Sequence, residues 1–425
     1  MEKGESTPEI NRLRESALDS AKMLADQLTF LDEKVEELFK KKCQRYTEKF
    51  WNELPMVYKE KNSDPLAISL FHHFDSIRNI LKGLLENFYP YSVCWEKSSV
   101  EDEGAISALT RFETFMGHLD DILEVFEVSL EKKEGYSHSL FFHASFGYSV
   151  SSSPVDVGEV LHRQLLQTSV ATLFTSATLA NASGDKGAKG LEWATGYSYL
   201  EAQNRFKAPF FLPSPYDYEN KTRIFLCDDT PGFYEGQFVE FCLQRLNSLI
   251  RSIGGRSLFL FSAKARFEVA REILLDKFEG ELPVFIQGMG QNVVEDFKQS
   301  QNGILLGMES FGEGIDIPGE TLQFIFIDKI PDLRRDRVTQ ERMDFFDSRV
   351  GNSFEDYYLS HRARSLHQKL GRLLRTESDY GGVIIVDSRI RRWKGRTMEK
   401  FFKLMEPYKI LKTPLKEAIS GVKDF

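Results

Sequence analysis

The sequence has 425 residues, of which 41% are hydrophobic and 28% are charged, which is typical of a globular protein of two or three domains with an ample core. Its net charge of −9 excludes a generally basic protein, so a nucleic-acid site would have to be a local patch. The N-terminus lacks the apolar region of a signal peptide, no apolar run could span a membrane, and the four cysteines lie far apart, so we expect a cytoplasmic protein with reduced thiols and no metal site.

Residues 1–136 predict a helical domain. From about Pro8 to Lys59 the pattern is helical, and apolar residues recur at four-three spacing in a heptad-like seam. The seam consists of Leu24, Leu28, Leu31, Val35 and Leu38. Because it covers only about two to three heptads, it favours an intramolecular helical hairpin over an oligomerising coiled coil.

Two further helices are expected in this region. Asp64-Pro65 offers an N-cap and a first-turn proline for the next helix. Tyr89-Pro90-Tyr91 predicts the end of that helix, and Val93 to Trp95 predicts a short strand. A third helix is expected from Gly104 to Leu130.

Residues 137–205 show a different pattern. Leu140 to Val150 is rich in aromatic and small residues, which indicates a strand, and Glu159 to Leu166 predicts a short helix. The β-branched run Val170 to Thr175 predicts a buried parallel strand that leads into the small hydroxyl residues Ser176 and Thr178.

Residues 206–425 alternate between strand and helix patterns, which predicts a parallel sheet covered on both faces. The expected strands are Arg223 to Cys227, Ser257 to Ser262, Val284 to Ile286, Ile304 to Gly307, Leu322 to Asp328 and Val383 to Asp387. The expected helices are Phe233 to Ile253, Ala263 to Phe278, Gln291 to Gln299 and Thr339 to Arg375. Ligands of such sheets bind at the carboxyl ends of the strands. The motif residues Thr175, Ser262 and Glu309 to Asp316 are all expected to follow strand ends, and Lys329 is a further candidate.

The stretch Gln368 to Arg375 reads Gln-Lys-Leu-Gly-Arg-Leu-Leu-Arg. If it is helical, Gln368, Arg372 and Arg375 share one face. Two guanidiniums projected together suit the charge of a transferring phosphoryl group, and Gly371 lets a ligand approach the backbone closely. A basic helix face exposed to water is the alternative interpretation.

Four stretches together resemble the later motifs of superfamily 2 helicases, and more narrowly those of the DinG/XPD-type DNA helicases. They are Thr175 to Leu179, Phe261-Ser262, Glu313 to Asp316 and Gln368 to Arg375, which are similar to motifs III, IV, V and VI. The resemblance implies an α/β fold. Its RecA-like helicase C-terminal domain would be residues 206–425, preceded by a helical arch-like domain, 1–136, and by the rear part of an incomplete first RecA-like domain, 137–205.

The same resemblance implies parts that this sequence does not contain. It has no phosphate-cradling loop ending in Gly-Lys-Ser/Thr, no Asp-Glu-x-His box and no clustered cysteines. We therefore interpret the chain as the C-terminal part of an ATP-dependent helicase, sharing ATP and Mg²⁺ with a front-half polypeptide that carries the phosphate loop, and we expect no iron–sulfur cluster in this chain. Two smaller differences are Gly312, where the family has a large aromatic residue, and Asp332, where relatives have phenylalanine.

The resemblance also implies roles for single residues. Arg372 and Arg375 would reach the γ-phosphate, with Gln368 at the phosphate site or its water. The residues of the nucleotide site would be Glu313, Gly314, Asp316 and Gly371, and those that transmit closure between the domains would be Thr175, Ser176 and Thr178. For Glu313 an N-capping or ion-pair role is the alternative, and for the three hydroxyl residues a turn satisfied by its own hydroxyls.

Single-stranded DNA would run across both RecA-like domains, with Ser262, Lys264 and Arg266 as candidate contacts to its backbone. Two basic groups could add electrostatic attraction, or they could be solvated surface. They are Arg334, Arg335 and Arg337, and Arg389, Arg391, Arg392, Lys394 and Arg396. Trp393 could stack a base, but packing is the more usual role of such a residue.

The sequence thus predicts the C-terminal part of a DNA helicase that acts in repair or replication. Whether this chain alone is an enzyme stays open, because the phosphate loop and the magnesium-binding box are not in the sequence. The alternative is a non-catalytic nucleic-acid-binding scaffold subunit, or a truncated product, that kept the helicase fold.

Overall fold

The structure is a computed structural model that describes residues 8–43, 46–48, 51–56, 64–98, 103–175, 189–203, 214–312, 317 and 319–424. The chain divides into two compact units. The first unit comprises residues 1–156 and 335–342, and the second comprises residues 157–334 and 343–425. The division after Asp156 differs from the predicted domain boundary at residue 137.

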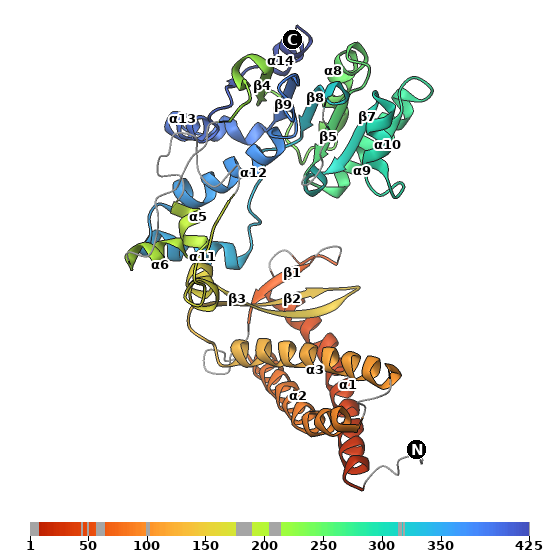
Figure 1. Cartoon of the computed structure of the whole chain (residues 1–425), viewed down its shortest axis with the longest axis vertical. Helices are drawn as coiled ribbons and strands as arrows, with labels where there is room; N and C mark the ends of the chain where they lie inside the picture. The colour runs from red at the N-terminus through yellow and green to blue at the C-terminus, as the bar shows by residue number, and fades with distance from the viewer. Residues whose placement is uncertain are drawn as a thin grey trace. The chain divides into compact units, whose positions relative to one another are not determined.

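The first unit packs long helices against a small antiparallel sheet (Figure 1). The helices are α1 (Pro8–Lys42), α2 (Pro65–Ser98) and α3 (Glu103–Leu130). The sheet has the order β1-β2-β3 and consists of β1 (Asn52–Pro55), β2 (Tyr136–His143) and β3 (Gly147–Pro154). Leu31, Val35 and Leu38 of the predicted seam are buried in the core of this unit, as expected for intramolecular packing.

The N-cap at the start of α2 is confirmed, because the Asp64 carboxylate accepts a hydrogen bond from the Leu66 N–H at 3.1 Å. Two other predictions in this unit are wrong. α2 continues through Pro90 to Ser98, where a helix end and a strand were expected. Asn52–Pro55 is a strand instead of the end of a helix, because its backbone pairs with β2 and satisfies the edge of that strand.

The second unit is built on a seven-stranded sheet in which every strand pair is parallel, which confirms the predicted α/β class. The strand order is β10-β4-β9-β8-β5-β7-β6. The strands are β4 (Thr222–Cys227), β5 (Ser257–Phe261), β6 (Val284–Ile286), β7 (Ile304–Met308), β8 (Phe324–Ile327), β9 (Gly381–Val386) and β10 (Ile410–Lys412). All except β10 were predicted from their apolar runs.

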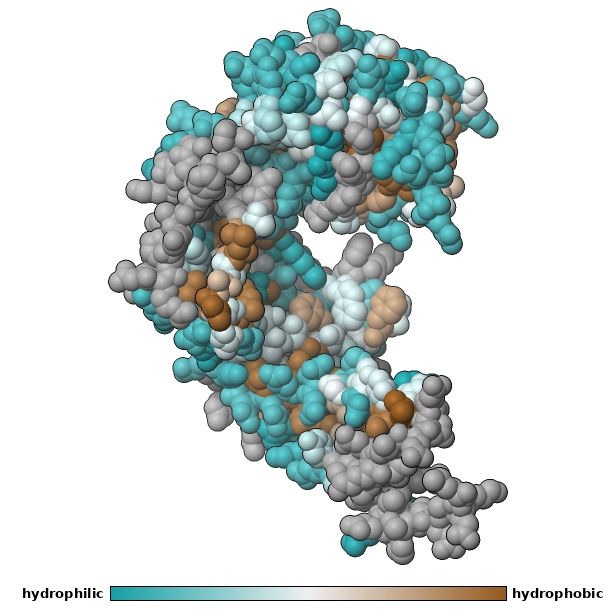
Figure 2. Space-filling model, viewed as in Figure 1, coloured by the Kyte–Doolittle hydropathy of each residue, from teal (hydrophilic) through white to brown (hydrophobic). Residues whose placement is uncertain are grey.

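Helices cover both faces of this sheet (Figure 1). On one face lie α8 (Phe238–Ser252), α9 (Lys264–Phe278) and α14 (Leu415–Lys423), and on the other α10 (Val293–Ser300), α12 (Ser360–Leu370) and α13 (Gly395–Leu404). Side chains alternate between the two core layers: Phe225 of β4 enters the first and Leu226 the second. Burial on both faces explains why these strands are continuous apolar runs, whereas the outer face of the unit seen in Figure 2 is mainly hydrophilic.

Residues 157–203 belong to the second unit. They form α4 (Val157–Leu161), a π-helical turn (His162–Leu166), α5 (Lys189–Ala194) and α6 (Tyr197–Ala202). Trp193 of α5 is buried, and its ring centroid lies 5.5 Å from those of Phe346 and Tyr357. Phe346 lies in α11 (Arg337–Arg349), and Tyr357 lies in the π-helical segment Ser353–Leu359 that leads into α12.

The strand predicted at Val170 to Thr175 is wrong. Residues 171–175 have no regular structure, and Val170 and Leu173 are 104% and 87% exposed. A buried parallel strand needs hydrogen-bonded neighbours, and none of the strands in the described part of the chain pairs with this run. The assignment of residues 137–205 to a first RecA-like domain, and of residues 1–136 to an arch, stays a prediction.

Candidate nucleotide and nucleic-acid site

The carboxyl edge of the parallel sheet carries polar residues directly after four strands. Ser262 follows β5, Glu309 follows β7, Asp328 follows β8 and Asp387 follows β9. Parallel strands bring these ends to one edge of the sheet, as the sequence predicted for Ser262 and Glu309.

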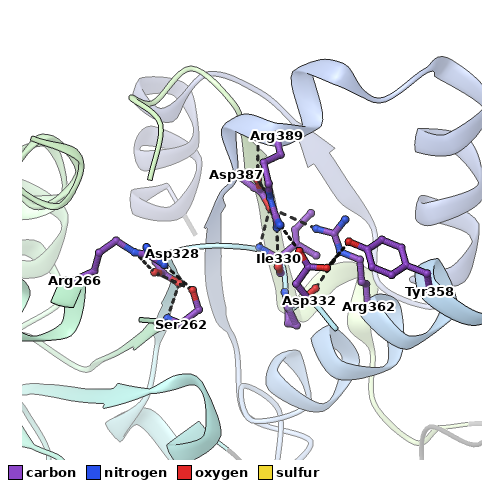
Figure 3. Close-up of polar contacts among 10 residues, drawn as sticks. Ser262, Arg266, Asp328, Ile330, Asp332, Tyr358, Arg362, Asp387 and Arg389 are labelled. Atoms are coloured by element: carbon purple, nitrogen blue, oxygen red, sulfur yellow. Dashed lines mark hydrogen bonds and ion pairs between the residues drawn. The ribbon is translucent and has the colours of Figure 1, made fainter. Parts of the chain in front are cut away.

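Asp328 is the centre of a buried polar cluster at the ends of β5 and β8 (Figure 3). Its carboxylate accepts hydrogen bonds from the Ser262 N–H at 2.9 Å and from Arg266 Nε at 2.7 Å. Arg266 also donates to the Ser262 hydroxyl at 2.7 Å. Burial raises the pKa of Asp328, and the ion pair with Arg266 opposes that rise. The cluster fixes the start of α9 to the end of β8.

This cluster bears on the three predicted DNA contacts. Arg266 donates from all three guanidinium nitrogens within the protein, to Asp328, to Ser262 and, at 3.2 Å, to the carbonyl of Phe233. Ser262 and Arg266 therefore have a structural role that the sequence did not reveal. Lys264, the first residue of α9, is the exposed member of the three.

Asp387 and Asp332 form a second polar network with two arginines, separate from the first in Figure 3. Arg389 donates to both oxygens of Asp387, at 2.8 and 2.6 Å, to the carbonyl of Ile330 at 3.0 Å and to Asp332. Arg362, which is 3% exposed, donates to the carbonyl of Pro331 at 3.0 Å and lies 3.6 Å from Asp387. The network joins the loop after β8, the end of β9 and α12.

Asp332 stands where the family resemblance leads us to expect phenylalanine, and its polar partners explain how it is accommodated. It accepts hydrogen bonds from the Tyr358 hydroxyl and from Arg389. Burial alone would raise the pKa of Asp332, but Tyr358, Arg362 and Arg389 hold it below its usual value. Local packing is therefore satisfied around this departure from the family pattern.

Two residues of the basic group that follows β9 are bonded within the protein, which leaves fewer of them to attract a nucleic acid. Arg389 is committed to two carboxylates, and Arg391 donates to the carbonyl of Thr230 at 2.8 Å. Trp393 packs against Phe401, with ring centroids 5.2 Å apart, and lies 5.0 Å from the guanidinium of Arg362. Trp393 thus has the packing role that the sequence favoured.

Lys369 lies inside the Gln368 to Arg375 stretch and is buried, with 1% of its surface exposed. Its ammonium makes an ion pair with Glu309 at 3.1 Å and donates to the Ser365 hydroxyl at 3.2 Å. The end of α12 is thereby joined to the segment that follows β7. Sequence reasoning missed this pair, because nothing in a single charged residue indicates its partner.

The predicted helix through Arg375 is wrong in its last turn, since α12 ends at Leu370. Gln368 is exposed on the last turn of α12, whereas Arg372 and Arg375 are half-buried in the following turn. Leu373 and Leu374 are buried between them. A methyl group added at Gly371 would lie 3.3 Å from the carbonyl oxygen of His367, so this glycine fits closely against its own helix.

Asp379 holds the turn after α12 in place. Its carboxylate accepts hydrogen bonds from the N–H groups of Arg375 at 2.7 Å, Thr376 at 2.9 Å and Gly319 at 3.1 Å. Burial alone would raise the pKa of Asp379, but these donors and the Thr376 hydroxyl lower it. The Arg375 carbonyl accepts from the Tyr216 hydroxyl at 3.0 Å, so both backbone groups of Arg375 are bonded to side chains.

Of the remaining predicted site residues, only one lies within the described residues. Thr175 is exposed in the segment without regular structure. Ser176, Thr178, Glu313, Gly314 and Asp316 lie outside the described residues. Within the described ranges no group of three or more His, Cys, Asp and Glu side chains could hold a metal ion, and no helix combines the length and apolar character needed to cross a bilayer.

The chain is similar to several known proteins. Residues 246–408 match the family model of the helicase C-terminal domain. The chain is 30% identical over 284 residues to a "Probable ATP-dependent helicase" of Methanocaldococcus jannaschii, a match that covers 62% of this chain and 41% of that protein. It is 30% identical over 252 residues to the "ATP-dependent helicase DinG" of Mycobacterium tuberculosis, covering 58% of this chain and 36% of that protein. The matches thus span about two fifths of the length of these relatives.

A solved structure shares the fold. That of S. tokodaii Xpd4 matches with a TM-score of 0.50 and 13% identity, and the match covers 95% of this chain and 70% of that one. At this identity the likeness concerns the fold alone.

Proposed function

This chain carries the helicase C-terminal domain of a DinG/XPD-type superfamily 2 helicase, and we propose that it supplies the arginines that contact the γ-phosphate during ATP hydrolysis. Arg372 and Arg375 take this role, and Gln368 contacts the phosphate or its attacking water. Arginines of this kind contribute about 10³–10⁵ in rate in related motors.

The observation that carries the proposal is the anchoring of Arg375. Both its N–H and its carbonyl are bonded to side chains, those of Asp379 and Tyr216. This fixes the position from which the guanidinium starts, and preorganised charge is what stabilises a transferring phosphoryl group. Asp379 also binds the N–H of Gly319, so it couples this turn to the segment after Glu313 to Asp316.

The phosphate loop and the magnesium-binding carboxylates come, in this proposal, from a polypeptide segment outside this sequence. ATP and Mg²⁺ are then shared between that segment and this chain. The residues of this chain at the nucleotide are Glu313, Gly314, Asp316 and Gly371, and those that transmit closure are Thr175, Ser176 and Thr178. Single-stranded DNA passes the carboxyl edge of the sheet near Lys264.

The test is a DNA-stimulated ATPase assay of the chain alone and mixed with a front-half polypeptide that carries the phosphate loop. We expect turnover only in the mixture, reduced by about 10³-fold in Arg372→Ala or Arg375→Ala. Arg271→Ala is the matched control, because Arg271 is a partly exposed arginine of α9 that pairs with Glu268 at 2.9 Å. Turnover by the chain alone that is lost in Arg375→Ala would contradict the division of the site between two segments.

The second candidate function is a non-catalytic nucleic-acid-binding scaffold. One observation favours it: Arg266 and Arg389 pair with buried carboxylates at this edge of the sheet. These charged residues therefore stabilise the fold, which a scaffold also needs. It predicts salt-sensitive binding of single strands, without turnover by the chain alone or by the mixture. A place in DNA repair or replication, a cytoplasmic location and the absence of an iron–sulfur cluster from this chain belong to the helicase function proposed first.

A further inference from the structure

Three cations surround the ring of Phe233 at the carboxyl edge of the sheet. The guanidinium carbons of Arg266 and Arg389 lie 5.4 and 5.3 Å from the ring centroid, and the ammonium of Lys329 lies 5.8 Å from it. Phe233 is 9% exposed, so the aromatic ring that faces the three charges is nearly buried. We call Phe233, Arg266, Lys329 and Arg389 the Phe233 cluster.

The two arginines of the cluster are neutralised. Arg266 pairs with Asp328 at 2.7 Å, and Arg389 pairs with Asp387 at 2.6 Å and with Asp332. Their remaining donors reach the Ser262 hydroxyl and the carbonyls of Phe233 and Ile330. Neither guanidinium therefore needs a ligand to satisfy its charge.

Lys329 is different. It directly follows Asp328 after β8 and is only partly exposed. Among the residues that the structure describes, no carboxylate or other acceptor lies within bonding distance of its ammonium, whose contact is the face of Phe233. Burial and the neighbouring Arg389 lower the pKa of Lys329, while Asp332, Asp328 and Glu309 oppose that effect. A cation that has lost water without gaining a carboxylate is stabilised by an incoming anion.

The surroundings are also favourable to an anion. The first turn of α9 contains Arg266, so this helix begins at the cluster, and no side chain caps its N-terminus at Ala263. Unpaired N–H groups at the start of a helix favour negative charge. Lys264 is exposed on the same turn and adds a second positive charge at this edge of the sheet.

From this geometry we propose that Lys329 is a phosphate-binding residue whose ammonium lies over the face of Phe233. The phosphate belongs either to the backbone of a single-stranded nucleic acid or to a nucleotide. The single-strand source rests on the function proposed above, whereas the phosphate site itself does not. Ser262 and Arg266 then position the site, and Lys329 contacts the ligand.

The first measurement follows the Lys329 side chain directly. The lysines of the whole chain are ¹³C-methylated, which retains their positive charge, and the Lys329 resonance is identified by its loss in Lys329→Arg. Inorganic phosphate, an oligothymidine and ATP are titrated in separate samples. We expect the resonance to move with inorganic phosphate, and the larger response among oligothymidine and ATP identifies the source. A resonance that does not respond to any of the three overturns the proposal.

The second measurement is the affinity for oligothymidine as a function of salt. We expect Lys329→Met to weaken binding about 5- to 10-fold near 0.1 M salt and to reduce the salt slope by about 0.7, the value for one phosphate contact on a single strand. Lys329→Arg should retain most of the affinity. Lys416→Met is the matched control, since Lys416 is an exposed lysine of α14. An equal effect in Lys416→Met overturns the proposal.

The two proposals fail in distinguishable ways. If the mixture with a front-half polypeptide shows no ATPase activity, the function proposed above fails, yet the phosphate titration still reports on Lys329. If Lys329→Met unfolds, which its thermal denaturation shows, the titration of the wild-type chain still decides. If ATP moves the resonance and oligothymidine does not, the site stands and its ligand is the nucleotide.

Discussion

The ammonium of Lys369 lies 3.1 Å from the carboxylate of Glu309, and this pair joins the end of α12 to the segment after β7. The two partners are not equally buried: the Lys369 side chain is 1% exposed and that of Glu309 is 28% exposed. Loss of the glutamate would leave a cation without access to water, whereas loss of the lysine would leave an anion that water can reach.

The first prediction follows from this asymmetry. Glu309→Ala should lower the free energy of unfolding by about 3 kcal/mol, and Lys369→Met by about 1 kcal/mol. The double variant should be more stable than the sum of the two losses implies. Urea unfolding of the four proteins gives the comparison, and equal losses in the single variants would contradict it.

The second prediction concerns Asp379. Asp379→Ala removes the acceptor of the Arg375, Thr376 and Gly319 N–H groups, so the free energy of unfolding should fall by about 2–4 kcal/mol. Amide exchange at Arg375 and Gly319 should accelerate together. Glu377→Gln is the control within the same turn, because Glu377 is exposed. Faster exchange at Arg375 without a change at Gly319 would show that the carboxylate does not link the two segments.

The third prediction concerns Asp332. Asp332→Phe leaves Arg389 and the buried Arg362 without this carboxylate, and the free energy of unfolding should fall by about 3 kcal/mol. Tyr358→Phe removes only one hydroxyl donor to Asp332 and should cost about 1 kcal/mol. Denaturant unfolding monitored by tryptophan fluorescence measures both changes. A phenylalanine that is tolerated without loss would mean that the network is dispensable.

The fourth prediction is a pH dependence of stability. Burial, together with Arg364 and Lys369, lowers the pKa of His361 to about 4, and burial also lowers the pKa of His367. An unfolded histidine has a pKa of about 6.5, so below that pH the unfolded state takes up a proton that the folded state does not. The contribution of the neutral, buried His361 to the free energy of unfolding is therefore fully present above about pH 6.5 and is lost as pH falls toward about 4.

The expected loss from His361 is about 2–3 kcal/mol over this window. Urea unfolding at a series of pH values measures it, and His361→Gln should flatten the dependence. As a control, replacement of the exposed His118 in α3 should leave the pH dependence of the second unit's free energy of unfolding unchanged. An unchanged slope in His361→Gln would assign the effect to other groups.

The strands of the second unit could be predicted because each is a short apolar run between polar segments. Phe259 and Phe326, for example, lie in strands whose residues are buried in both core layers. β10 was missed because only Ile410 of its residues is buried, so its sequence carries little of that signal. At Val170 to Thr175 the strand signal is strong, yet the prediction is wrong. A β-branched run forms a strand only when neighbouring strands supply hydrogen bonds.

The site could be predicted only in its sequence motifs. Gln368, Arg372 and Arg375 were found from their spacing, but the end of α12 at Leu370, ahead of the buried Leu373 and Leu374, was not. The partners of Ser262 and Arg266 could not be predicted, because Asp328 lies more than 60 residues away and meets them only once β5 and β8 are paired. Long-range ion pairs of this kind require the register of the sheet.

The position of β4 in the sheet has a consequence for synthesis of the chain. Its neighbours are β9 and β10, and Thr222 pairs with Gly381, so 381 − 222 = 159 residues separate the two strands. At about 5–20 residues per second, β4 waits roughly 8–30 s for its first partner. Strands β5 to β8 all lie within residues 257–327 and can pair earlier. We expect ribosome-bound chains stalled before Gly381 to expose Thr222–Cys227 to proteases and to holdase chaperones, and longer chains to protect it.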